Sequence, residues 1–226
     1  MMFMKLRLFM QAVIKFVLGV LIVALLVFLP AGSFAFVQGW VLMGVLFVPM
    51  FMAGIVMFIK NPELLKKRLD AKEKQREQSF VVKLSGLMFI LGFVLAGLDF
   101  RFGWFTLPME ISYVGASVLL LAYVMYAVVL RQNVYLSRTI EIQENQQVVD
   151  SGLYSVVRHP MYSATLLLFL SIPIVLGSLF SLGIFLAYPF IIAKRIRHEE
   201  ELLERELAAY KEYKVKVKYR LIPFVW

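Results

Sequence analysis

Long stretches without a charged residue constrain the fold of this chain more than any other feature. Phe16–Ile59, Leu84–Leu98, Ile111–Leu130 and Met161–Ala193 contain no Asp, Glu, Lys or Arg. One membrane crossing needs about 20 apolar residues, so the first stretch is long enough for two helices. A water-soluble domain has no reason to carry so much apolar sequence. We therefore predict an all-α, polytopic integral membrane protein.

Proline and glycine residues divide these stretches into separate helices. The first stretch breaks at Pro30-Ala-Gly-Ser33, and the helix after it ends at Asn61-Pro62, because proline cannot continue the backbone hydrogen-bond ladder. The last stretch is interrupted by Pro173 and by Gly177-Ser178. Each of its halves is about 22 Å long as a helix, which is short against a hydrocarbon core of about 30 Å and favours a tight hairpin. These breaks predict about six membrane helices, at about Gln11–Leu29, Gln38–Ile59, Val82–Leu98, Glu110–Leu130 and the two halves of Met161–Ala193.

The basic residues indicate the orientation in the membrane. Of the 24 Lys and Arg residues, Arg101 alone falls in a loop on one side, and the rest lie at the start of the chain, in the two long polar segments or after Ala193. The positive-inside rule places those segments in the cytoplasm. We therefore predict that both termini are cytoplasmic, in the inner membrane if the cell is prokaryotic.

The same distribution suggests two regions and limits the partners. Residues 1–130 read as a four-helix membrane region with a charged cytoplasmic loop at 60–83, which favours a short amphipathic helix or a solvated connector. Residues 131–226 read as the functional core.

The net charge of +9 would suit a nucleic acid, but topology and anionic lipid headgroups explain it better. We predict contact with membrane lipids and no nucleic-acid partner. The chain has no Cys, which excludes disulfides, thiolate catalysis and lipidation on Cys.

Two polar clusters next to apolar helices carry the candidate chemistry. Arg158-His159-Pro160 precedes the first helix of the hairpin. Pro160 is suited to the first helical position. The N–H groups of Met161 and Tyr162 at this helix N-terminus are suited to binding an anion. From the tripeptide alone, an interfacial Arg-His anchor with a proline cap is the favoured interpretation. Polar groups at a hydrocarbon boundary are nevertheless functional candidates by default.

The second cluster lies on the predicted cytoplasmic helix after Ala193. Glu200 falls among Ile196, Leu203, Leu207 and Tyr210 on one helical face, so it is a poor candidate for a solvated charge. His159 and His198 are the only histidines, and their spacing fits no ligand pattern, so we predict no metal site. The sequence holds no phosphate-binding glycine loop or dinucleotide fingerprint.

Three ordered blocks resemble a known family. QQVVDSGLYSVVRHPMY, RIRHEEELL and AYKEYKVKVKYRLIP resemble the isoprenylcysteine carboxyl methyltransferase family and its bacterial and archaeal relatives, over about Asn133–Pro223. Asn61-Pro-Glu-Leu-Leu also resembles the prokaryotic branch. The chain departs from the family at Leu153, where proline is frequent, and at Ser163, where glycine is often seen.

The resemblance implies methyl transfer from S-adenosylmethionine in a membrane-embedded site. It implies that Arg195 binds the substrate and that Glu199 closes the cofactor pocket from the last helix. The other cofactor residues that it implies are Gln146, Gln147, Val148, Val149, Tyr154, His159, Pro160, Met161 and Tyr162.

The chemistry that follows has one leading form and three alternatives. A hydrophobic carboxylate, entering laterally from the bilayer, needs no deprotonation, and Arg195 could hold it by a charge-assisted pair. An amine acceptor, as in phospholipid N-methylation, must lose a proton, so Glu200 is a candidate catalytic base. An NADPH-dependent sterol-type reductase shares a similar His-Pro-x-Tyr region. The remaining alternative is a non-enzymatic membrane protein.

Overall fold

The computed structural model describes residues 2–69, 76–136 and 146–226 of the chain. Most of these residues are helical, as predicted. The helices are α1 (Met2–Ala31), α2 (Val37–Lys60), α3 (Pro62–Leu69), α4 (Arg76–Phe102), α5 (Met109–Gln132), the 3-10 helix η1 (Gly152–Ser155), α6 (Pro160–Val175), α7 (Leu179–Phe185), α8 (Tyr188–Glu206) and α9 (Ala208–Lys216).

Length and composition make most of the long helices candidate membrane spans. Among the described residues, five helical segments are long and apolar enough to cross a bilayer, and α6 is a shorter apolar helix. The segments are Lys5–Ala31, Val37–Lys60, Ser79–Phe102, Met109–Gln132 and Leu179–Glu206. The prediction of an all-α polytopic membrane protein with about six membrane helices is confirmed.

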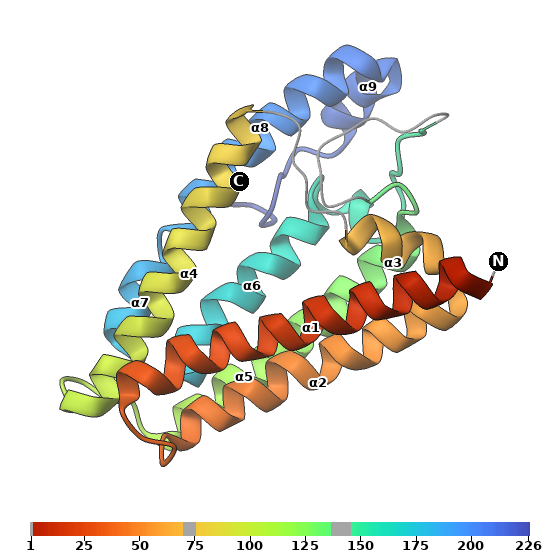
Figure 1. Cartoon of the computed structure of the whole chain (residues 1–226). Helices are drawn as coiled ribbons and strands as arrows, with labels where there is room; N and C mark the ends of the chain where they lie inside the picture. Colours follow the sequence, from red (N-terminus) through yellow and green to blue (C-terminus); the bar gives the residue numbers. More distant parts are fainter. Residues whose placement is uncertain (1, 70–75, 137–145) are drawn as a thin grey trace.

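α1 and α2 run side by side in opposite directions (Figure 1). α1 also packs along α4, α2 packs against α5, and α4 lies along α7 and α8. α6 contacts α2, α4, α5, α7 and α8, most extensively α5. It has no polar stripe, and most of its residues are buried, as expected of a helix that is apolar around its circumference.

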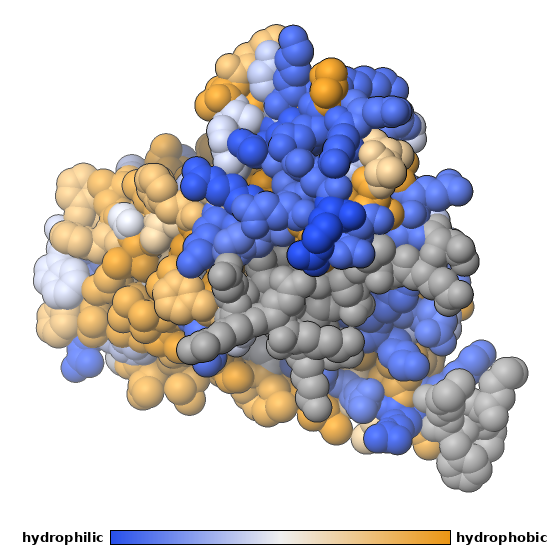
Figure 2. Space-filling model, turned by 90° about the horizontal axis from the view of Figure 1, so that it is seen from above, coloured by the Kyte–Doolittle hydropathy of each residue, from blue (hydrophilic) through white to orange (hydrophobic). Residues whose placement is uncertain are grey.

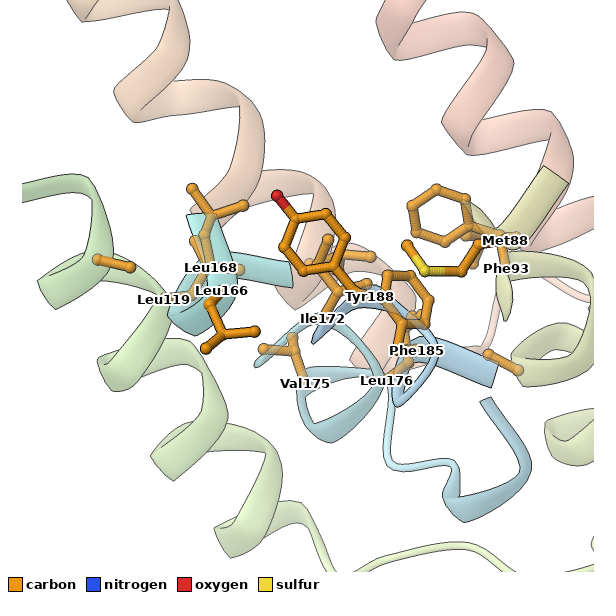
Figure 3. Packing of buried hydrophobic residues seen from close by; sticks show 14 of the residues in the cluster. Met88, Phe93, Leu119, Leu166, Leu168, Ile172, Val175, Leu176, Phe185 and Tyr188 are labelled. Carbon is orange, nitrogen blue, oxygen red and sulfur yellow. The ribbon is translucent and has the colours of Figure 1, made fainter. Parts of the chain in front are cut away.

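The core lies where α6 meets these neighbours. Figure 3 shows Leu166, Leu168, Ile172 and Val175 of α6 close to Phe185 and Tyr188. Phe185 packs against Gly92 of α4 so closely that a Cβ at this glycine would lie 2.3 Å from its ring. The absence of a side chain at position 92 therefore lets α4 and α7 approach each other.

One end of the bundle carries Arg101, the loop 103–108 and the turn at Leu176–Ser178, and we call it the Arg101 end. Asp99 is fully buried there. One of its carboxylate oxygens accepts from the backbone N–H of Phe105 at 2.8 Å, and the other from the hydroxyl of Ser178 at 2.5 Å. The hairpin turns at Gly177 and Ser178, as predicted, and Asp99 fastens this turn to the loop after α4.

The opposite end, which carries α3, η1, α9 and the C-terminal segment, holds the polar groups; we call it the α9 end. Seen from this end, hydrophilic residues cover much of the surface and apolar residues cover the flanks (Figure 2). The structure does not place either end on a particular side of a membrane. The cytoplasmic orientation therefore stays a prediction, as does the division of the chain at residue 130.

Some predicted boundaries are wrong in an informative way. We expected a separate helix after Ala193, but α8 runs without a break from Tyr188 to Glu206. The chain instead leaves helical geometry at Leu207, whose φ and ψ are −122° and 101°, so Tyr210 belongs to α9 rather than to the stripe that holds Glu200. In the loop 60–83, Pro62–Leu69 forms the short helix α3, and α4 begins at Arg76, earlier than expected.

Candidate active site

A pocket of about 100 Å³ opens at the α9 end of the molecule. Segments distant in sequence surround it: the end of α5, the segment 146–149, η1, the first turn of α6, α8 and α9. The lining residues are Asn133, Tyr135, Leu136, Gln146, Gln147, Val148, Val149, Tyr154, Arg158, His159, Met161, Tyr162, Arg195, Glu199, Leu202, Leu203, Leu207 and Tyr210.

The structure brings together almost all the site residues that the sequence indicated. The predicted cofactor residues lie on the pocket wall with the exception of Pro160, which is buried beneath it as the first residue of α6. Arg195 also lies on the wall, whereas Glu200 does not. What each residue binds stays a prediction at this point.

The first turn of α6 is organised differently from the prediction. The N–H of Tyr162 donates to the carbonyl of His159 at 3.0 Å, so it is not open to an anion. The N–H groups of Arg158 and His159 donate to the carbonyls of Tyr219 and Arg220, each at 2.9 Å. This turn therefore presents side chains rather than an open row of amides, and the His159 and Tyr162 rings stack at 5.7 Å between centroids.

Three polar side chains form a chain of hydrogen bonds along one wall. The hydroxyl of Tyr162 donates to Oε2 of Glu199 at 2.5 Å and accepts from Nε of Arg195 at 3.0 Å. Arg195 and Glu199 are four residues apart on α8, which places both on one helical face. Tyr162, contributed by α6, joins them and fixes the orientation of an arginine and a carboxylate beside the same cavity.

Glu200 lies at the centre of a cluster of ion pairs. Its side chain is 3% exposed, and its Oε1 accepts from Nε of Arg158 at 2.7 Å and lies 3.2 Å from Nε2 of His159. Its Oε2 accepts from Nε of Arg220 at 2.9 Å. Both carboxylate oxygens are engaged by these groups, which gives Glu200 a structural role, and the prediction that Glu200 acts as a catalytic base stays a prediction.

The ion pairs of Glu200 connect three parts of the chain. Arg158 precedes α6, Glu200 lies on α8, and Arg220 belongs to the C-terminal segment. Arg158 also donates through Nη1 to the carbonyls of Val217 at 2.7 Å and Lys218 at 2.8 Å. A buried charge is tolerated when it is paired and hydrogen-bonded, and this cluster meets that condition while fixing the base of the pocket.

The opposite wall is built on tyrosines. The hydroxyl of Tyr154 accepts from Nδ2 of Asn133 at 3.1 Å, and its carbonyl accepts from the hydroxyl of Tyr213 at 2.7 Å. Burial raises the pKa of Tyr154 and Tyr213 above the usual range, so both phenols are neutral at physiological pH. These bonds fasten η1 between the end of α5 and α9.

Tyr210 is a pocket residue that the sequence reasoning did not assign to the cofactor. It lies on α9, is 4% exposed, and its hydroxyl has no hydrogen-bond partner among the residues that the structure describes. Burial raises its pKa as well, so the hydroxyl keeps its proton. A buried polar atom without a partner is rare in native proteins, and its place on the pocket wall indicates a ligand that completes it.

Asn133 and Arg220 were not assigned either. Asn133 follows α5 directly, and the only sequence signal was its place at the start of the polar segment. Arg220 lies in the basic segment near the C-terminus, where many lysines obscure the one arginine of that segment that pairs with Glu200. Ser163, noted as a departure from the family, donates to the carbonyl of Leu221 at 2.6 Å, so it holds the same C-terminal segment.

Comparison with known proteins agrees with this geometry. Residues 113–205 match the model of the isoprenylcysteine carboxyl methyltransferase (ICMT) family. A search of curated proteins finds no match to the chain. The matched residues run from α5 into α8 and include Tyr162, Arg195 and Glu199, so this part of the chain is similar to an ICMT-family domain. The family implies a membrane methyltransferase, and its members generally use S-adenosylmethionine.

Proposed function

We propose that the protein transfers the methyl group of S-adenosylmethionine to a carboxylate on an isoprenoid or another lipid-like molecule. The observation that carries this proposal is the pairing of Arg195 and Glu199 through Tyr162 on the wall of one pocket. The two charged groups can serve two ligands, because the carboxylate suits a cationic or hydroxyl-bearing cofactor and the guanidinium suits an anionic acceptor.

The donors and acceptors of the pocket fit S-adenosylmethionine. Glu199 can accept from its amino group or ribose, and Tyr210 on the same pocket wall carries a buried hydroxyl without a hydrogen-bond partner in the described part of the chain. Val148 and Val149 provide apolar wall beside Tyr154. When bound, the cofactor supplies a methyl group already activated by its sulfonium, so the protein chiefly has to align donor and acceptor.

Arg195 holds the acceptor carboxylate in this proposal. Its Nε is hydrogen-bonded to Tyr162, which fixes the plane of the guanidinium. A guanidinium with a fixed plane orients a carboxylate, because its N–H groups form a rigid fork. A carboxylate oxygen is a nucleophile without losing a proton, which agrees with the engagement of both Glu200 oxygens elsewhere. The structure therefore gives the amine acceptor no supporting observation.

The cofactor and the acceptor are expected to reach the site by different routes, because the protein lies in a membrane. We propose that the α9 end faces the cytoplasm, since Arg101 is the one basic residue at the other end by the sequence pattern. The cofactor then enters from water at the α9 end, and the lipid-like acceptor enters from the bilayer between helices. Membrane lipids are the expected surroundings, and no nucleic acid is involved.

Isothermal titration calorimetry on the full chain in detergent tests the cofactor. We expect S-adenosylmethionine and its demethylated product to bind and NADPH to show no heat. Binding of NADPH alone would instead support a sterol-type reductase. We further expect Glu199→Ala to abolish cofactor binding, whereas Arg195→Ala retains binding and loses turnover. Equal loss of binding in the two variants would refute the division of roles between Arg195 and Glu199.

Labelled cofactor and a lipid extract test the acceptor. The protein is incubated with methyl-labelled S-adenosylmethionine and a membrane lipid extract, and the products are treated with base. A carboxylate acceptor gives an ester whose label base releases. A label that resists base would indicate N-methylation and overturn the carboxylate assignment.

A further inference from the structure

α3 is a short helix that other parts of the chain hold firmly in place. Its start is capped by Asn61, whose Oδ1 accepts from the N–H of Leu64 at 3.1 Å. Leu65 is buried, and Nζ of Lys15 in α1 donates to the carbonyl of Leu69 at 2.5 Å. Fixed in this way, the helix directs its last basic residue, Arg68, inward against α5 and α6.

The Arg68 guanidinium contacts two uncharged neighbours. Its Nη2 lies 3.7 Å from the sulfur of Met161, a weak acceptor, and its central carbon lies 5.6 Å from the centre of the Tyr126 ring. Its Nε is buried and has no hydrogen-bond partner within the described part of the chain. No described carboxylate forms an ion pair with it. A desolvated donor of this kind is costly unless an anion completes it.

Arg68 also lies next to the site proposed for methyl transfer. Met161, which it contacts, lines the pocket, and Tyr162, the next residue, is bonded to Arg195. The guanidinium groups of Arg68 and Arg195 therefore contact two consecutive residues, Met161 and Tyr162, in the first turn of α6. Adjacent helical residues project about 100° apart, so Arg68 approaches this turn from a different direction than Arg195.

We propose that Arg68 binds an oxyanion, carboxylate or phosphate, on an amphiphilic molecule that enters from the membrane. The occupant's identity as the methyl acceptor rests on the proposed function. The site itself rests on the buried Nε, the weak sulfur contact and the absence of a described carboxylate partner. Tyr126 supplies an aromatic face on which the guanidinium can stay fixed while its N–H groups bind the anion.

Electron paramagnetic resonance with spin-labelled lipids tests this proposal. The full chain is placed in phosphatidylcholine nanodiscs with spin-labelled stearate, its uncharged methyl ester or spin-labelled phosphatidic acid, and the immobilised fraction is measured. In the unmodified protein we expect at least one anionic probe to bind more tightly than the ester. Arg68→Gln should remove about a tenfold preference, and Arg68→Lys should retain part of it. The anionic probe whose binding weakens more in Arg68→Gln identifies carboxylate or phosphate as the preferred group.

The matched control is Lys66→Gln, which removes one positive charge from an exposed position of the same helix. It should keep the preference that Arg68→Gln loses. A weakening of stearate and ester by the same factor would show that Arg68 only packs, and no anionic preference in the unmodified protein would also overturn the proposal. S-adenosylmethionine affinity should be unchanged in Arg68→Gln, since a loss would place Arg68 in the cofactor pocket instead. Failure of the unmodified protein to bind this cofactor would count against the proposed function and leave the lipid result intact.

Discussion

Replacing Glu200 by Gln separates a structural role for this carboxylate from a catalytic one. The substitution keeps the shape of the side chain and removes its charge. One carboxamide oxygen can still accept, but the NH2 group must then face a donor, either Arg158 and His159 or Arg220. The variant thus leaves a buried guanidinium without its counter-charge at a site where Arg158 is 4% exposed.

The size of the effect follows from burial. Breaking a buried ion pair by removing one partner costs about 3–5 kcal/mol. For a chain of this length such a loss lowers the unfolding temperature by on the order of 10 °C. Arg220→Gln should cost less, about 1–3 kcal/mol, because that side chain is 28% exposed and one of its contacts faces water more openly. Glu201→Gln, at an exposed neighbouring position, should have almost no effect.

The assay is thermal unfolding of the purified variants in detergent, followed by size-exclusion fluorescence, together with cofactor titration on the folded fraction. We expect stability to fall in the order Glu201→Gln, Arg220→Gln, Glu200→Gln. A Glu200→Gln protein that is as stable as the unmodified chain and binds S-adenosylmethionine, yet transfers no methyl group, would refute the structural interpretation and restore Glu200 as a base.

Other predictions follow from single contacts. Tyr162→Phe removes the hydroxyl between Arg195 and Glu199, and calorimetry should show about tenfold weaker S-adenosylmethionine binding because a hydrogen bond to a charged group is lost. Tyr210→Phe should leave stability unchanged and weaken the same binding about three- to tenfold, whereas unchanged affinity would show that its hydroxyl meets no ligand. Gly92→Ala should lower the free energy of unfolding by about 1–3 kcal/mol, since its Cβ would collide with Phe185. Gly86→Ala, with open space around it, is the control, and equal effects would contradict the packing argument.

The membrane helices were predictable because their signal is local. An uncharged stretch of sufficient length has few alternatives to a spanning helix, and Pro30 or Gly177 marks where the chain turns. The end of the last helix was harder to predict, since the charges after Ala193 suggested a new element. Charge changes the solvent that a helix prefers but does not interrupt its backbone hydrogen bonds, so α8 continues to Glu206.

The candidate site was predictable as a set of residues and not as a network. The apolar stripe around Glu200 indicated correctly that this carboxylate is buried. Its partners could not be inferred, because Arg158 and Arg220 lie 42 and 20 residues away in the chain and are two among many basic residues. Local spacing identifies which face of a helix a charge occupies, whereas only the packed structure shows which distant charge meets it.

The ion pairs of Glu200 also explain why the site depends on residues outside the range that matches the family. The match ends at residue 205, yet Arg220 pairs with Glu200, and the carbonyls of Val217 and Lys218 accept from Arg158. Tyr213 fixes η1, and Tyr210 closes the pocket. Because α9 and the C-terminal segment position α6 and α8 relative to each other, the distance between Tyr162 and Glu199 depends on them. The pocket is therefore assembled by tertiary contacts of the C-terminal segment as much as by the motifs of α6 and α8.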